Sequence, residues 1–284
     1  MDRRRLIVLA ALAAVAATTE AAAREIVTSH LGGERDHIVV VARDGSRRRI
    51  ASDLVAWTPV WSPDHARVAY HGARTYDAGF EEVTVVARSG RRERRITGFG
   101  WSFPSWSPNG RWITASCSRP GPCERREGLY RIDVDRPRRK VRVRHTAGAS
   151  QSSWAPGGSR IVFVDDRQGR GELFVKRFGR PRLRRLTNSD VDEAAPDWGP
   201  GGRWIVYSKP RTPSEPHDLW MVSADGDRQR RLTRTRASET NPAWSASGRR
   251  ILFSTRRGLF TVRRDGGARR KVEGSRGRDC CADW

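Results

Sequence analysis

TPVWSPDHARVAY, residues 58–70, is a phrase that recurs along this chain and decides its fold. Variants of it read FPSWSPNGRWITA (103–115), SSWAPGGSRIVFV (152–164), APDWGPGGRWIVY (195–207) and NPAWSASGRRILF (241–253). A sixth copy begins as CCADW at 280–284 and ends with the chain. Its tryptophans recur at intervals of 45, 48, 44, 46 and 40 residues: Trp61, Trp106, Trp154, Trp198, Trp244 and Trp284. Such a period is typical of repeated supersecondary units.

Each repeat predicts four short antiparallel strands. A segment that ends in the motif tryptophan leads into a Ser-Pro-Asp/Asn-Gly type turn, which proline and glycine favour. An alternating apolar run follows, then a third run, and then a basic pair as in RRLT at 184–187. Period-two alternation indicates half-buried strands. Four strands in a repeat of this length predict an all-β, six-bladed β-propeller over residues 24–284.

The two ends of the chain supply the last blade. CCADW is one strand, and the three runs REIVTS (24–29), HIVVVARDG (37–45) and RRRI (47–50) have no blade of their own. We expect the C-terminal strand to pair with these N-terminal strands, which closes the ring and removes two exposed sheet edges. We also expect the motif tryptophans to be wedged between blades.

The phrase Pro-x-Trp-Ser-Pro-Asp-Gly, followed by an apolar strand and an Arg-Arg-Leu-Thr run, resembles the TolB-type propeller repeat. WSPDH at 61–65, WSPNG at 106–110 and RRLT at 184–187 and 230–233 carry the resemblance most clearly. It implies a propeller, and its relatives include envelope scaffolds, peptidase propeller domains and carbohydrate-active enzymes. TolB also has an amino-terminal α/β domain, so the resemblance is to a stand-alone propeller of this family.

Residues 1–23 read as an export signal. Arg3, Arg4 and Arg5 precede the apolar run LIVLAALAAVAA (6–17), and Ala21–Ala23 provide small residues for cleavage. The run is short for a membrane span. We therefore expect an exported protein, periplasmic or extracellular, with no membrane anchor after the signal is removed. About 260 residues remain, which suits one propeller, and we expect a monomer.

The formal net charge is +23, and arginine supplies most of it. Basic pairs fall on the outermost strand of each predicted blade, at 48–49, 94–95, 184–185, 230–231 and 270–271. Charges there protect edge strands from pairing with other chains, or they form a basic rim that binds an anionic envelope polymer. Nucleic acid is not an expected partner, because aromatic residues are not interleaved with these pairs.

Four cysteines in an exported protein indicate disulfides. Cys117 and Cys123 flank Ser-Arg-Pro-Gly-Pro, which turns the chain, so we predict that they are bridged to each other. Cys280 and Cys281 are adjacent. They could form a vicinal disulfide, cross-link two chains or bind a soft metal.

A candidate site lies at the channel mouth, where the innermost strands begin. Loops entering these strands bring Asp192, Glu193, Glu239 and Asp279, and loops leaving the second strands bring His71, Asp165, Asp166 and Lys209. We predict that this acidic centre binds a partner or a cation, with calcium as the one cofactor considered, since carboxylate oxygens suit it. The alternative is carboxylates that pair with the chain's own arginines.

Catalytic motifs are absent from the sequence: it has no G-x-S-x-G elbow, no H-E-x-x-H and no P-loop. The sequence therefore favours a non-enzymatic binding or scaffold protein of the cell envelope or extracellular space. One alternative is a polyanion binder that uses the arginine rim. The other is a propeller enzyme that acts on a carbohydrate or a peptide.

Overall fold

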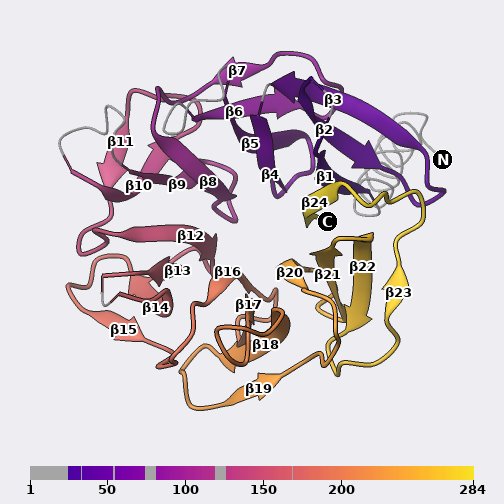
Figure 1. Cartoon of the computed structure of the whole chain (residues 1–284). Helices are drawn as coiled ribbons and strands as arrows, with labels where there is room; N and C mark the ends of the chain where they lie inside the picture. The colour runs from indigo at the N-terminus through magenta and orange to yellow at the C-terminus, as the bar shows by residue number, and fades with distance from the viewer. Residues whose placement is uncertain (1–24, 33, 54, 74–80, 119–125, 168) are drawn as a thin grey trace, which may run out of the picture.

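The computed structural model describes residues 25–32, 34–53, 55–73, 81–118, 126–167 and 169–284. Twenty-four strands form six four-stranded antiparallel sheets arranged in a ring around a central channel (Figure 1). The predicted all-β, six-bladed propeller is therefore confirmed. The predicted signal, residues 1–23, lies outside the described residues. Among the described residues there is no helix with the length and hydropathy needed to span a bilayer.

Every blade repeats the same order of strands from the channel to the rim. The innermost strands are β4 (Val55–Trp61), β8 (Trp101–Trp106), β12 (Ala149–Trp154), β16 (Ala194–Trp198), β20 (Thr240–Trp244) and β24 (Asp279–Asp283). The second strands are β5 (Arg67–Ala73), β9 (Trp112–Cys117), β13 (Arg160–Asp165), β17 (Trp204–Lys209), β21 (Arg250–Thr255) and β1 (Ile26–His30). The third strands are β6 (Glu82–Ala87), β10 (Gly128–Asp133), β14 (Glu172–Arg177), β18 (Asp218–Ser223), β22 (Gly258–Arg263) and β2 (Asp36–Val41).

The outermost strands are basic, and all but one have only two or three residues. They are β7 (Arg94–Arg95), β11 (Lys140–Arg142), β15 (Leu183–Arg185), β19 (Gln229–Arg231), β23 (Arg270–Lys271) and β3 (Arg47–Asp53). The predicted placement of the basic pairs on the edge strands is confirmed. We number the blades in chain order: first (β4–β7), second (β8–β11), third (β12–β15), fourth (β16–β19), fifth (β20–β23) and closing (β24 with β1–β3).

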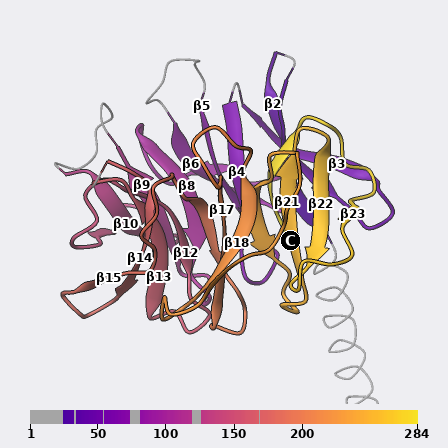
Figure 2. The ribbon, with the colours of Figure 1, turned by 60° about the horizontal axis from the view of Figure 1, so that its bottom comes forward.

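The closing blade joins the two ends of the chain, as predicted. β24 pairs antiparallel with β1, with Val27 opposite Asp283 and His30 opposite Asp279. In Figure 1 the yellow C-terminal strand lies beside the indigo N-terminal strands and the chain ends at the inner edge of the ring, and Figure 2 shows the C-terminus beside β21. The closure leaves the innermost strand of the blade facing the channel and the outermost strand facing the rim.

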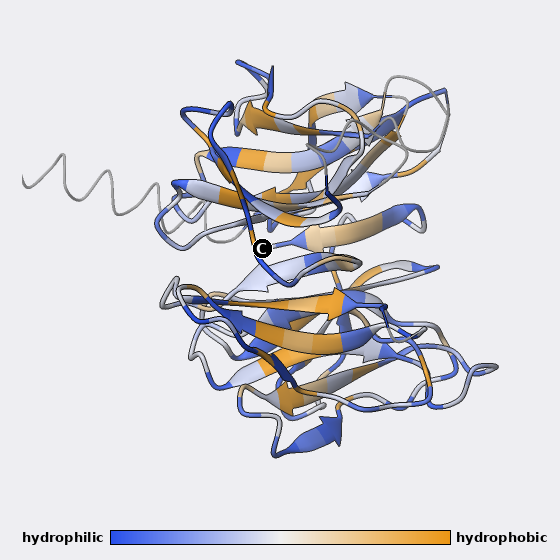
Figure 3. Cartoon of the chain, turned by 90° about the vertical axis from the view of Figure 1, so that its left-hand side faces the viewer, coloured by the Kyte–Doolittle hydropathy of each residue, from blue (hydrophilic) through white to orange (hydrophobic). Residues whose placement is uncertain are grey.

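The core lies between neighbouring blades rather than within one sheet. Figure 3 shows apolar residues along the middle strands of each blade and polar residues in the turns. The five motif tryptophans that precede Trp284 are 5–7% exposed. The indole nitrogens of Trp106 and Trp284 donate to the carbonyl oxygens of Val60 and Ala243, which belong to the preceding blade. The motif tryptophans therefore lie between blades, as the sequence predicts.

Candidate functional site

Three of the four acidic residues predicted at the start of innermost strands are buried, not exposed at the channel mouth. Glu193, Glu239 and Asp279 are 2%, 0% and 1% exposed. Each stands five residues before its motif tryptophan, the position that Ala56, Trp101 and Ala149 occupy in the other blades.

Each of these carboxylates has a cationic partner in its own blade. The Lys209 ammonium lies 3.3 Å from Glu193, and Arg269 lies 3.6 Å from Glu239. Asp279 accepts hydrogen bonds from Arg47 at 2.6 and 2.8 Å. Burial opposes ionisation of Asp279, but the hydrogen bonds from Arg47 hold its pKa below its usual range.

The remaining predicted residues are spread around the ring. Asp192 and Asp166 are exposed, and an Asp192 carboxylate oxygen accepts the Gly171 amide. Asp165 is buried and pairs with Arg167 at 2.7 Å. Within the described residues, no three His, Cys, Asp or Glu side chains gather into a group that could hold a metal ion. The structure therefore does not bring the predicted acidic residues together as a calcium site, and Glu193, Glu239 and Asp279 instead pair with cationic side chains of their own blades.

His71 faces the channel wall from β5 and is 2% exposed. Burial lowers its pKa to about 3, so the ring is neutral at physiological pH. Its Nδ1 lies 2.7 Å from the Thr58 hydroxyl and accepts the Phe103 amide at 3.4 Å. His71 therefore positions two neighbouring residues of the channel wall, one from the first blade and one from the second.

The structure reveals a ring of six residues that the sequence analysis missed. Each stands three residues before a motif tryptophan: Thr58, Phe103, Gln151, Ala195, Asn241 and Cys281. All six have φ between 45° and 56°, a left-handed conformation that is uncommon outside glycine. The pairing of every innermost strand is irregular at this point, as in a β-bulge. The fixed offset from the tryptophan was the signal that could have located them.

This ring lines a cavity of about 140 Å³ in the channel. The residues just before the motif tryptophans line it as well, and they include Asp197 and Asp283. Burial raises the pKa of Asp197 to about 6. Burial, together with repulsion from Asp197, raises the pKa of Asp283 to about 7. The channel therefore holds two carboxyl groups that change charge near neutral pH.

Comparison with known proteins identifies the fold. The model of the TolB beta propeller domain matches residues 26–284. The chain belongs to the TolB β-propeller family. A search of curated protein sequences finds no match to it.

Solved structures agree with this assignment. The crystal structure of TolB from Acinetobacter baumannii is 22% identical, with a TM-score of 0.77, and the alignment covers 92% of this chain and 66% of that protein, slightly less than two thirds. Putative TolB from Agrobacterium tumefaciens is 18% identical, with a TM-score of 0.69. The alignment covers 89% of this chain and 91% of that protein. An oligogalacturonate lyase in complex with manganese is 10% identical, with a TM-score of 0.59, over 88% of this chain and 74% of that one.

In this TolB-family propeller, two cysteines lie at the channel wall. Cys280 and Cys281 are free thiols with their sulfur atoms 3.0 Å apart. The hydrogen bond between the two sulfur atoms lowers the pKa of Cys281 and raises that of Cys280. The Asn241 amide approaches the Cys281 sulfur at 3.5 Å. The predicted bridge from Cys117 to Cys123 stays a prediction, because Cys123 lies outside the described residues.

Two exposed aromatic side chains stand where innermost strands of this TolB-family ring begin. Trp57 precedes the ring residue Thr58 and is 42% exposed, and Phe99 in the loop before β8 is 43% exposed. The Trp57 and Phe103 rings both contact the His71 ring, at centroid distances of 6.1 and 5.2 Å. We use the name channel mouth for Trp57, Phe99 and the six ring residues.

Proposed function

We propose that the chain is an exported binding protein of the cell envelope or extracellular space, and that its channel mouth binds a partner protein. Export is supported by the charged start, short apolar run and small residues of 1–23. Catalysis is not part of this proposal, since neither the motifs nor the pairing of the buried carboxylates indicates it.

The observation that carries the proposal is the composition of the channel mouth. The left-handed ring holds six different side chains toward one cavity. Residues held in such conformations cluster at binding and active sites. Trp57 directly precedes a ring residue and Phe99 stands four residues before another. Exposed aromatic side chains of this kind are typical of protein interfaces, where they supply much of the binding energy.

Loss of the exposed aromatic residues tests the proposal. A Trp57→Ser, Phe99→Ser double variant is expected to fold like the wild type, because both side chains are exposed, but to lose at least about tenfold in affinity for the partner. The partner is first isolated with the wild-type protein from an envelope extract and identified by mass spectrometry, and its affinity is then measured with purified components.

Val141→Ser is the matched control, because Val141 is 37% exposed on the rim strand β11. We expect this variant to bind the partner as the wild type does. If the control and the double variant lose affinity for the partner equally, or if the double variant binds the partner as tightly as the wild type, the channel mouth is not the binding surface.

A further inference from the structure

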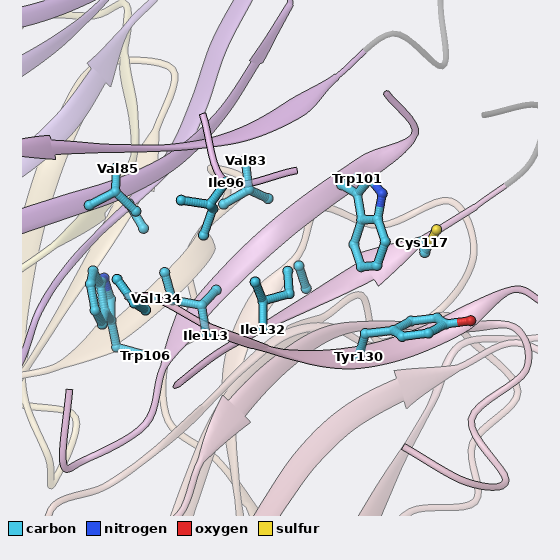
Figure 4. Close-up of a cluster of buried hydrophobic side chains, with 12 residues drawn as sticks. Val83, Val85, Ile96, Trp101, Trp106, Ile113, Cys117, Tyr130, Ile132 and Val134 are labelled. Atoms are coloured by element: carbon cyan, nitrogen blue, oxygen red, sulfur yellow. The ribbon is translucent and has the colours of Figure 1, made fainter. Parts of the chain in front are cut away.

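The repeat provides an internal standard for the contact between neighbouring blades. Near the rim, the third strand of each blade has one residue that faces the next blade. The residue after it faces the preceding blade. Between the first and second blades these are Val85 and Ile132, which pack in one apolar cluster with Trp106 and Ile113 (Figure 4). Val175 and Val222 occupy these places between the third and fourth blades, and Met221 and Val262 between the fourth and fifth.

The contact between the second and third blades departs from this standard. The register of the strands places Arg131 where other blades have Val40, Val85, Val175, Met221 and Thr261. It places Lys176 where other blades have Val41, Val86, Ile132, Val222 and Val262, which are 0–1% exposed. Two cationic side chains therefore face one gap, at places that hold uncharged side chains between the other blades.

Lys176 is as deeply buried as the aliphatic residues that it replaces, with 4% of its surface exposed. Its ammonium donates to the carbonyl oxygens of Arg180 and Pro181, at 2.7 and 3.0 Å. Burial and the nearby Arg144 lower the pKa of Lys176. A buried ammonium is costly without a negative partner, and no described carboxylate forms a salt bridge with it.

The gap opens into a groove of about 370 Å³ that collects further positive charge. Its ionisable side chains are Arg131, Arg142, Arg144, His145, Lys176 and Arg180, and no carboxylate lines it. The Arg131 guanidinium stacks on the Phe178 ring at 4.5 Å, which fixes its plane. The Arg142 Nε is buried and has no hydrogen-bond partner. Elsewhere buried carboxylates pair with arginines, as Glu172 does with Arg185 at 2.9 Å.

We propose that this groove is a binding site for a phosphate-type oxyanion. Guanidinium groups bind the oxygens of such an anion in pairs, and a lysine ammonium adds a point charge. A multivalent anion between Arg131 and Lys176 supplies the negative charge that the two side chains lack. The exposed Arg144, His145 and Arg180 flank the opening, so the phosphate can be free or carried by a lipid headgroup at the groove entrance.

Lys176→Val is the decisive variant, because it installs the residue type that the repeat itself uses at this position. We expect it to melt at or above the wild-type temperature in buffer without phosphate. Inorganic phosphate is then titrated at constant ionic strength against chloride. Phosphate should raise the melting temperature of the wild type by mass action, and Lys176→Val should weaken its affinity about tenfold or more, as the loss of a charge-assisted hydrogen bond predicts.

Lys271→Val is the matched control, since it removes the same charge from the exposed rim strand β23. Lys271→Val should keep the wild-type response to phosphate, whereas Arg131→Val should weaken the affinity for phosphate as Lys176→Val does. Equal phosphate responses of the wild type and Lys176→Val, or equal effects of phosphate and chloride at matched ionic strength, would overturn the proposal.

Vesicles distinguish the source of the phosphate. Phosphatidylglycerol vesicles that bind the wild type and Lys271→Val, but not Lys176→Val, assign the phosphate to a lipid headgroup. Equal vesicle binding by all three proteins, together with the phosphate shift, assigns the site to soluble phosphate.

Discussion

Asp283 and Asp197 show how single side chains connect blades at the channel wall. An Asp283 oxygen accepts the Trp61 amide at 2.8 Å, and an Asp197 oxygen accepts the Trp244 amide at 2.7 Å. Each carboxyl group therefore links one blade to the motif tryptophan of the next. Because folding raises the pKa of both carboxyl groups, their protonation affects stability in the physiological pH range.

Asp283→Asn should change the pH dependence of stability. The folded-state pKa of Asp283, about 7, lies above its unfolded value, so the native state binds the proton more tightly. The stabilisation that Asp283 contributes to the native state is therefore fully present below about pH 4 and is lost as pH rises to about 7. The asparagine oxygen can still accept a hydrogen bond from the Trp61 amide. The free energy of unfolding of the variant, relative to that of the wild type, should therefore be higher at about pH 8 than at about pH 4, by on the order of 2–4 kcal/mol.

Urea unfolding of both proteins at the two pH values measures this difference. Comparing the variant with the wild type removes the opposite contribution of Asp279, whose pKa is lowered. A stability difference that does not change with pH would contradict the assignment of a raised pKa to Asp283.

At the scale of the strand, the Arg-Arg-Leu-Thr run recurs because the hydroxyl group of its last residue binds the third strand of the blade. Thr187 accepts the Leu173 amide at 2.9 Å, and Thr233 accepts the Leu219 amide at the same distance. Thr97, Thr146 and Ser275 bind the corresponding amides of β6, β10 and β22. The hydroxyl thus joins the end of an outermost strand to the third strand of its blade.

Thr187→Val should cost about 1–3 kcal/mol in the free energy of unfolding, because it leaves the buried Leu173 amide without an acceptor and removes the donor shared by Glu172 and Glu193. Thr187→Ser keeps the hydroxyl and should stay within about 1 kcal/mol of the wild type. Chemical denaturation of the two variants tests this. Similar losses for serine and valine would show that the methyl group, not the hydroxyl, matters.

Strand identity was predictable because alternation and turn residues are local signals. The pairing of Glu193 with Lys209 was not, since it depends on contacts across a blade. A signal for the burial of Glu193 and Glu239 did exist: the same repeat position holds Ala56, Trp101 and Ala149 elsewhere. The left-handed ring was missed because its residue types differ in every blade, and only the offset from the tryptophan is constant.

At the scale of the whole molecule, the ring depends on one strand contributed by the C-terminus. β24 pairs with β1 and packs against both neighbouring blades. Its Asp283 binds the first blade, and the Trp284 indole binds the carbonyl oxygen of Ala243 in the fifth. The chain ends are therefore held by three blades at once.

Deletion of residues 280–284 should open the ring. The edge of β1 and the adjoining apolar residues Ile26 and Ala243 would be exposed, so we expect a sharp fall in melting temperature and increased aggregation. A Cys280→Ala, Cys281→Ala variant keeps the strand and controls for the two thiols. Its melting temperature should stay close to that of the wild type. If the truncated chain melts like the full chain, closure is not what stabilises the ring.

Photo-crosslinking from an innermost strand and from a rim strand tests most directly whether the channel mouth is where the propeller binds its partner. A photoreactive residue is placed at Trp57 in one protein and at Val141 on the rim in another, and both are irradiated with the identified partner. We predict a crosslink from position 57 that excess unlabelled propeller abolishes, and none from position 141. A crosslink from the rim position alone would contradict the account.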